Sequence, residues 1–465
     1  MPILPLILAA AAAIAAGFLA VTAQPEYLLL FTGGLLVSVF AFASPKLSLV
    51  LLIFSMLLSP EMSLGGVSAS RSAVLRYDDI LLVIVFFSWL ARAAVLKNKP
   101  FLTETPVQTP MLIYTLLAVA STALGVLRGE VRFEVSVFYV LKYVEYFLLY
   151  FMTVNILDSR EEMKKYLKYA FVVALLVTVY AYYYYYSSGS DARASAPFEA
   201  AVGRPQESEP AALGGYYLLV FGFILAALTE YSGAVFILAA AVMIFMFPAF
   251  LLTFSRASYI GFAAMVPVLV AISRKRKLMM TSFFGIGLAA LSLAPGIAGK
   301  VQNRIMMTYT GQYATNIVDI GSAGQVKLED SAATRVRALK WVLYEKLPQH
   351  PILGSGVTGI GLGDTQYALV LGELGLAGLC VFIWMIYRVF STARKVYRAY
   401  EEPWIKALSL GLMASITGLL FQAVGVNTFI LVRVMEPFWF LTALVMALYK
   451  DIPAAGKAEA AGADI

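Results

Sequence analysis

The chain has 465 residues, of which 61% are hydrophobic and only 14% are charged. A soluble globular protein carries about 25% charged residues, so this composition excludes an ordinary soluble enzyme. Apolar runs of the length needed to cross a bilayer recur from end to end. The chain is therefore predicted to be an all-α polytopic membrane protein, with about 12–14 transmembrane helices and 14 as the best count.

The net charge of +7 does not indicate nucleic-acid binding, because the basic residues gather in short loops between spans. A single cysteine, Cys380, and a single histidine, His350, exclude a disulfide framework, a thiolate metal cluster and a His-rich metal site. The apolar N-terminus lacks a charged region before it, and more spans follow it, so it is read as a first span rather than a cleaved signal peptide.

In chain order, the apolar runs predict spans over 3–22, 27–43, 46–59, 79–96, 110–127, 135–157, 167–186, 211–229, 233–254, 257–273, 278–295, 367–390, 405–424 and 429–449. Four domains follow: an N-terminal bundle over 1–295, a loop over 296–366, C-terminal helices over 367–450 and a tail over 451–465. Because the basic loops all fall on one side, that side and both termini are predicted to be cytoplasmic. The loop 296–366, about 70 residues long, is then periplasmic and expected to fold.

Arg256 stands between two apolar runs, in the stretch TFSRASYIG. A charge at that place is costly in a membrane. One interpretation is that its guanidinium only reaches the outer headgroups. The other is that Thr253, Ser255 and Ser258 form a polar pocket around it, in which the planar fork of the arginine binds phosphate oxygens.

The long loop contains a second candidate. Residues 330–348 predict an amphipathic helix that ends at Pro348. Its apolar face is predicted to comprise Val336, Leu339, Val342, Leu343 and Leu347. Arg335 borders this face and is a candidate ligand, whereas Arg337 points away and is expected to be solvated.

The glycines at 354, 356, 359, 361 and 363 superficially resemble a phosphate-binding loop, but no GK[ST] follows, so a flexible turn is the simpler interpretation. Asp364 then stands at the mouth of the next span, and Glu373 lies deeper in it. Lys142 with Glu145, and Arg433 with Glu436, are intramembrane pairs at a helical spacing of three, which permits mutual neutralisation.

The order TFSRASYIG, TRVRALKW, HPILGSG and Tyr367-x5-ELGLAGL resembles the O-antigen ligase and O-antigen polymerase family of integral-membrane glycosyltransferases. The stretches LRYDDILLV and KYVEYFLLY are also similar, and the likeness runs from about Leu75 to Leu448. The resemblance implies a bacterial inner-membrane enzyme with a periplasmic active site. It would transfer or polymerise a glycan from an undecaprenyl-diphosphate donor to a glycan or lipid acceptor, with inversion and without metal or cofactor.

Carried onto this sequence, the resemblance implies that Arg256 and Arg335 hold the diphosphate. The family's ligases place a histidine just before the span that corresponds to 367–390, but here the element reads GDTQY. Asp364, rather than Thr365, is therefore the candidate base. This departure favours a polysaccharide polymerase, or another branch of the family, over a lipid-A ligase. Lys142, Glu145, Glu373 and Arg433 are possible supporting residues.

Two alternatives remain. A transporter of small anions such as bicarbonate would place its polar site near the midplane, between related halves with interrupted helices, and the sequence shows no such pairing. A structural scaffold would not explain the intramembrane charges.

Overall fold

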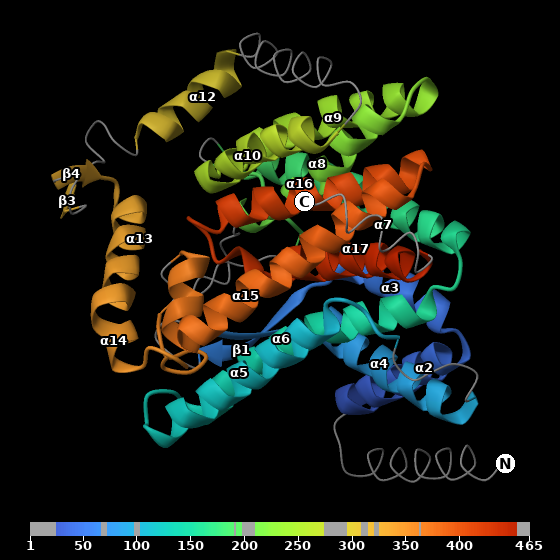
Figure 1. The fold of residues 1–465 in the computed structure, drawn as a ribbon, viewed down its shortest axis with the longest axis horizontal. Helices are drawn as coiled ribbons and strands as arrows, with labels where there is room; N and C mark the ends of the chain where they lie inside the picture. The colour runs from blue at the N-terminus through green and yellow to red at the C-terminus, as the bar shows by residue number, and fades with distance from the viewer. Residues whose placement is uncertain are drawn as a thin grey trace.

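The computed structural model describes residues 25–66, 72–96, 103–189, 192–197, 210–273, 295–307, 315–319, 325–361 and 364–452. The fold of these residues is a helical bundle, with two short antiparallel hairpins as its strands (Figure 1). The helices are α2 (Pro25–Ala43), α3 (Pro45–Leu58), α4 (Tyr77–Leu96), α5 (Gln108–Leu127), α6 (Phe133–Ile156), α7 (Arg160–Ser187), α8 (Pro210–Glu230), α9 (Ala234–Leu251), α10 (Arg256–Ile272), α12 (Pro295–Met306), α13 (Asp330–Trp341), α14 (Leu347–Gln349), α15 (Gln366–Ala399), α16 (Pro403–Gln422) and α17 (Val432–Lys450).

Among the described helices, eight are long and apolar enough to cross a membrane, and three shorter stretches are apolar as well. This confirms the prediction of an all-α membrane protein. The predicted spans coincide with helices α2 to α10 and α15 to α17, mostly within a few residues. The predicted spans 3–22 and 278–295 lie outside the described residues, apart from Pro295, so the count of 14 stays a prediction.

The polar ends of the bundle are chemically different. At the start of α16, Glu402 pairs with Arg160 at 2.8 Å, and Lys46 pairs with Glu162 nearby on α7. At the other end of α16, Gln422 donates to Ser258 of α10, at 2.9 Å. The basic residues Lys46 and Arg160 and the stretch around Arg256 therefore lie at opposite ends of the bundle.

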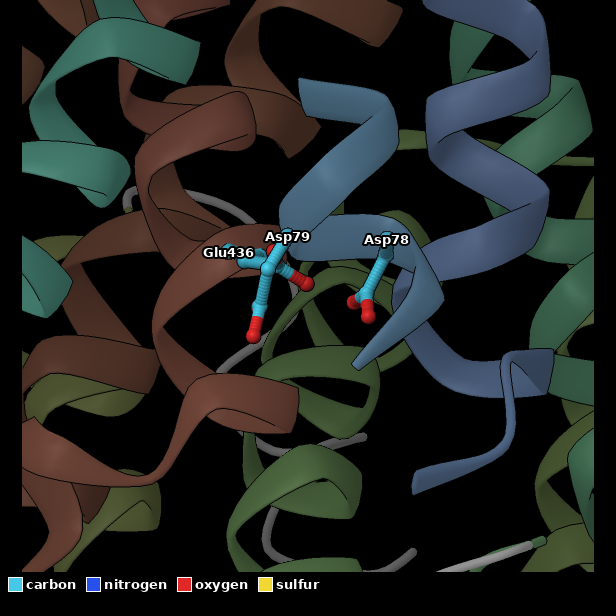
Figure 2. Close-up of side chains that lie close together, drawn as sticks. All are labelled: Asp78, Asp79 and Glu436. Atoms are coloured by element: carbon cyan, nitrogen blue, oxygen red, sulfur yellow. The ribbon is translucent and has the colours of Figure 1, made fainter. Parts of the chain in front are cut away.

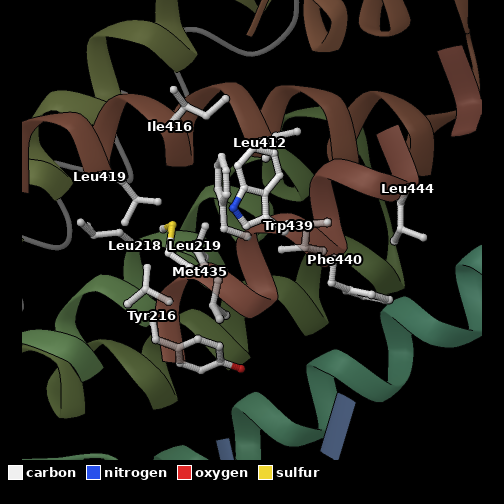
Figure 3. Close-up of a cluster of buried hydrophobic side chains, with 14 of the residues drawn as sticks. Tyr216, Leu218, Leu219, Leu412, Ile416, Leu419, Met435, Trp439, Phe440 and Leu444 are labelled. Atoms are coloured by element: carbon white, nitrogen blue, oxygen red, sulfur yellow. The ribbon is translucent and has the colours of Figure 1, made fainter. Parts of the chain in front are cut away.

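The core lies between α8, α16 and α17, whose side chains interdigitate in Figure 3. Trp439 and Phe438 pack edge to face, 5.0 Å apart, and Tyr217 stacks on Phe221. Small residues allow the backbones to approach, as is common between membrane helices. A Cβ on Gly261 of α10 would stand 2.5 Å from the carbonyl oxygen of Gly418 on α16.

The segment between α10 and α15 is folded where the structure describes it. Strands β3 (Asn316–Asp319) and β4 (Gln325–Leu328) form a hairpin, and Asn316 pairs with Leu328 in its register. Helix α13, continued by a π-helical turn over Val342–Lys346, runs across the ends of the bundle helices rather than alongside them (Figure 1). A second hairpin, β1 (Glu61–Gly66) with β2 (Ser72–Arg76), connects α3 to α4.

Helix α15 is broken at Gly375, where φ is 68° and ψ is −165°. The turn at 351–356 fills this break: Leu376 donates to the Pro351 carbonyl at 2.9 Å, and Gly356 donates to the Glu373 carbonyl at 3.0 Å. The predicted span 367–390 is thus found as an apolar helical span that is broken at Gly375. The interpretation of the glycines at 354 and 356 as a flexible turn is wrong, because backbone hydrogen bonds hold this turn in place. Backbone groups freed by a break inside a membrane must be satisfied in this way.

Replacement of Gly375 by alanine is expected to lower the free energy of unfolding by at least about 2 kcal/mol, because its backbone region is open only to glycine. A Cβ would also lie 2.8 Å from the backbone nitrogen of Gly354. Denaturation of the detergent-solubilised protein, followed by tryptophan fluorescence, measures the change. Gly361→Ala is the control, since a Cβ there meets no described atom within 4 Å. Equal stability of the two variants would contradict the account of the break.

Candidate functional site

Arg256 is the first residue of α10, directly after a tight turn from α9. In this turn Phe254 has a φ of +48°, and the Thr253 hydroxyl donates to the Phe250 carbonyl at 2.7 Å. The guanidinium forms an ion pair with Glu329, and the side chains of both residues are 15% exposed. Because Glu329 immediately precedes α13, this pair fastens the outer segment to the bundle.

The hydroxyl groups near Arg256 form hydrogen bonds within the protein and do not line the polar pocket that the sequence predicts. Ser258 donates to Ser255 at 2.7 Å and accepts from Gln422 at 2.9 Å, so these groups tie α10 to α16. The interpretation of Thr253, Ser255 and Ser258 as a polar lining is thus replaced by a structural one. The sequence pattern could not show this, because Gln422 lies far along the chain.

Arg335 of α13 faces the same region. It lies 3.9 Å from the carboxylate of Asp364, and a Cβ on Gly425 would stand 3.7 Å from its Nε. Burial lowers the pKa of Arg335, and the nearby charges of Arg256 and Arg304 lower it further, while Asp364 and Glu329 oppose the shift. A guanidinium under these conditions remains charged, so it gains from any additional anion.

Two further arginines join this region. Arg304 of α12 lies 4.0 Å from Glu329, and Arg193 donates to the carbonyls of Thr253 and Phe254, at 2.9 and 3.2 Å. We call Arg193, Arg256, Arg304 and Arg335 the arginine cluster. Within the part of the chain that the structure describes, the carboxylates of Glu329 and Asp364 stand against these four positive charges, so the described charges sum to +2.

Sequence reasoning missed Arg193, Arg304 and Glu329. Glu329 was visible beside the predicted start of the loop helix, but nothing in the spacing connects it with Arg256, 73 residues earlier. Arg193 and Arg304 lie in polar segments without a periodic signal. Only the folded chain brings them to the turn before α10.

The predicted apolar face of α13 is only partly packed against the rest of the protein. Val342 is buried against α15 and the turn before it, and Ala333 is buried against the β3–β4 hairpin. Leu339 and Leu343, however, are 36% and 39% exposed. The π-helical turn after Trp341 explains part of the difference, because it shifts the helical register on which the predicted face depends. Arg337 is exposed and donates to Asn316, as expected.

Asp364 lies two residues before α15 and has a φ of +49°. Its side chain is 56% exposed, and Arg335 is its ion-pair partner. His350 is not at this place: its Nε2 lies 2.6 Å from Glu130 beyond the end of α5. Of the predicted site residues, the structure thus brings Arg256, Arg335 and Asp364 together.

The four supporting residues lie elsewhere. Lys142 pairs with Glu145 at 3.1 Å, as the spacing suggested, and also with Asp79. Arg433 donates to the carbonyl of Leu57 at 2.7 Å. Glu373 is buried at the break in α15 and accepts from the backbone nitrogen of Thr358 at 2.8 Å. These residues hold the bundle together, and none of their contacts named here involves the arginine cluster.

A cavity of about 750 Å³ opens between α3, α7, α8, α9, α16 and α17. Its walls are almost entirely apolar, with Lys164, Lys168 and Trp404 at the end of the bundle that carries the basic loops. Arg256, Arg335 and Asp364 are not among its lining residues. The cavity suits a hydrocarbon chain, whereas the arginine cluster suits an anion.

The fold and the arginine cluster define a multi-pass helical membrane protein that presents a cationic site at one end of its bundle. Residues 241–373 match the family described as O-antigen ligase, which supports the assignment to the O-antigen ligase and polymerase family. The matched stretch contains Arg256, Arg304, Glu329, Arg335 and Asp364. A comparison with curated proteins found no match. The family match indicates a glycan ligase or polymerase and does not support the anion-transporter alternative.

Replacement of Glu329 by glutamine is expected to tighten the binding of inorganic diphosphate by about tenfold, because it removes a carboxylate that competes for Arg256 and Arg304. Titration calorimetry on the detergent-solubilised protein measures this affinity. Asp330→Asn is the matched control, since it removes the same charge from the next, exposed residue. Weaker or unchanged binding by the Glu329 variant would argue against competition at this site.

Proposed function

We propose that the protein is a membrane glycosyltransferase that uses a glycan linked to a polyprenyl diphosphate, of the undecaprenyl type, as its donor. The observation that carries this proposal is the arginine cluster with its net charge of +2, because a doubly charged diphosphate complements it. The family match over residues 241–373 supports the glycan ligase or polymerase class.

In this proposal Arg256 and Arg335 bind the donor diphosphate, and Arg193 and Arg304 add to the positive potential. Glycosyl transfer breaks the bond between the anomeric carbon and the phosphate oxygen, so negative charge develops on the diphosphate as it leaves. Guanidinium groups that are already in position stabilise that charge in the transition state. These arginines supply the positive charge, so the proposed reaction uses no metal or cofactor.

Asp364 is proposed as the base. Its carboxylate is more than half exposed beside Arg335, so an acceptor hydroxyl has access to it next to the leaving group. Asp364 would take the proton from that hydroxyl as its oxygen attacks the anomeric carbon from the face opposite the diphosphate. The configuration at that carbon is then inverted. The aspartate in place of the family's histidine favours a polysaccharide polymerase over a lipid-A ligase.

The basic loops support an orientation. The positive-inside rule places Lys46, Arg160, Lys164 and Lys406 in the cytoplasm, and the arginine cluster then faces the periplasm. We therefore propose a bacterial inner-membrane protein with both termini in the cytoplasm. Its partners would be the lipid-linked oligosaccharide donor, a glycan or lipid acceptor and the surrounding bilayer.

Arg256→Ala and Arg335→Ala are each expected to lower glycan transfer by about 100-fold or more, because each removes a cation from the leaving group. The assay uses the reconstituted protein, with a polyprenyl-diphosphate oligosaccharide as donor, and follows chain length on gels. Arg337→Ala is the matched control, which should stay within about twofold of the wild type since its side chain is exposed and bonds only weakly. Full transfer by either cluster variant would refute the diphosphate-binding role.

Asp364→Asn is expected to lower kcat by about 100-fold to 10,000-fold while leaving the KM for the donor near its wild-type value. The amide keeps the shape of the side chain but cannot accept the proton. Asp330→Asn serves as the control for an acidic residue lost from the same segment. An Asp364→Asn protein with full activity would remove the base assignment, although the enzyme class would stand.

A further inference from the structure

Three carboxylates meet inside the bundle, away from the arginine cluster. Asp78 and Asp79 open α4, Glu436 is on α17, and Figure 2 shows the three side chains together. Their exposed fractions are 0%, 5% and 1%. One oxygen from each lies within 4.8 Å of the other two. We call these residues the carboxylate triad.

The contacts of the triad leave oxygens without donors. Asp78 accepts from the Ser59 hydroxyl at 2.7 Å and pairs with Arg76 at 2.7 Å. Asp79 accepts from the Arg76 backbone nitrogen at 2.9 Å and pairs with Lys142 through the same oxygen, Oδ2. Asp79 Oδ1 and Glu436 Oε2 are buried without a hydrogen-bond donor. A buried carboxylate oxygen without a hydrogen-bond donor is unfavourable unless a positively charged group or ion lies against it.

The local charges do not cancel. Among the residues whose side chains the structure describes, the buried cations around the triad are Arg76, Lys142 and Arg433, and Arg433 directs its guanidinium to the carbonyls of Leu57 and Ser59. The buried carboxylates in this group are the three of the triad and that of Glu145, which shares Lys142. With all seven of these groups ionised, three positive charges against four negative ones leave a net charge of −1 in a low-dielectric interior, where an uncompensated charge is strongly unfavourable.

We propose that the carboxylate triad binds one monovalent metal cation, Na⁺, between α4 and α17. A single positive charge brings the buried group to neutrality, whereas a divalent ion would leave it at +1. The geometry agrees, because three oxygens no more than 4.8 Å from one another can all lie within about 2.8 Å of one ion between them, a spacing that suits larger hard cations. Mg²⁺ requires about 2.0–2.1 Å and would need a tighter cage.

The bound ion joins parts of the chain that are distant in sequence. Asp78 and Asp79 begin α4 directly after the β1–β2 hairpin, and Glu436 lies one turn after Arg433, which holds the end of α3. The site lies outside the stretch 241–373 and does not depend on the proposed function. Its role is to stabilise the packing of α3, α4 and α17.

The test uses the full-length protein in lipid nanodiscs at constant pH and ionic strength, with NaCl replaced by KCl or choline chloride. We expect Na⁺ to raise the Tm by about 2 °C or more over choline, because it binds the folded state alone. Glu436→Gln should abolish this difference, since the amide removes the excess negative charge. Glu230→Gln is the control, because Glu230 is also buried but bonds to Tyr397 on another part of the bundle, and it should keep the response.

Binding of radioactive ²²Na⁺ to the wild-type protein gives a second measurement that does not depend on the folding of the variant. One ion per chain, displaced by unlabelled Na⁺, is the expected result. Three outcomes would overturn the proposal: an equal Tm in all three salts, stabilisation by Ca²⁺ alone, or a Tm that responds to pH and not to Na⁺. The last would assign the missing positive charge to a proton.

Discussion

The ion pair between Arg256 and Glu329 joins the first turn of α10 to the start of α13 and is one of the contacts that hold the outer segment against the bundle. Both residues are largely buried, so neither charge can be left alone without a substantial cost. Because α13 begins at this pair, Arg335 of α13 lies near the end of α16 and next to Asp364. The turn at 351–356 forms backbone hydrogen bonds with α15 at its break. These bonds hold in place the part of α15 that follows Asp364. The site is thus built from two segments that are each anchored to the bundle.

The same requirement, that a buried charge needs a partner, separates two polar regions with opposite balances. The arginine cluster has an excess of positive charge among the described residues, lies at the end of the bundle and is next to the half-exposed Asp364. It is therefore suited to an anionic substrate that binds and is released. The carboxylate triad has an excess of negative charge and is almost fully enclosed, so it is suited to a resident cation. The members of the first other than Arg193 lie within the stretch 241–373 that matches the O-antigen ligase family, and the carboxylate triad lies outside it.

Apolar length and isolated charges were sufficient to predict the helices and to single out Arg256, Arg335 and Asp364, because both signals are local in sequence. Other features depend on contacts between distant residues and left no such signal. The break at Gly375 exists because residues 351–356 supply its hydrogen bonds, and the apolar pattern of 367–390 continues straight through it. The i,i+3 spacing predicted the Lys142–Glu145 pair, but it could not show that Asp79 shares Lys142 or that Arg433 turns to the carbonyls of α3.

The central claim is that one anionic group of the donor occupies the arginine cluster. The most direct measurement is an electron cryomicroscopy structure of the protein in nanodiscs with a polyprenyl diphosphate bound. The account predicts diphosphate density within about 3 Å of the guanidinium groups of both Arg256 and Arg335, with the Glu329 side chain displaced from Arg256. Diphosphate density at the lysines of the apolar cavity, with the Arg256–Glu329 pair intact, would contradict it.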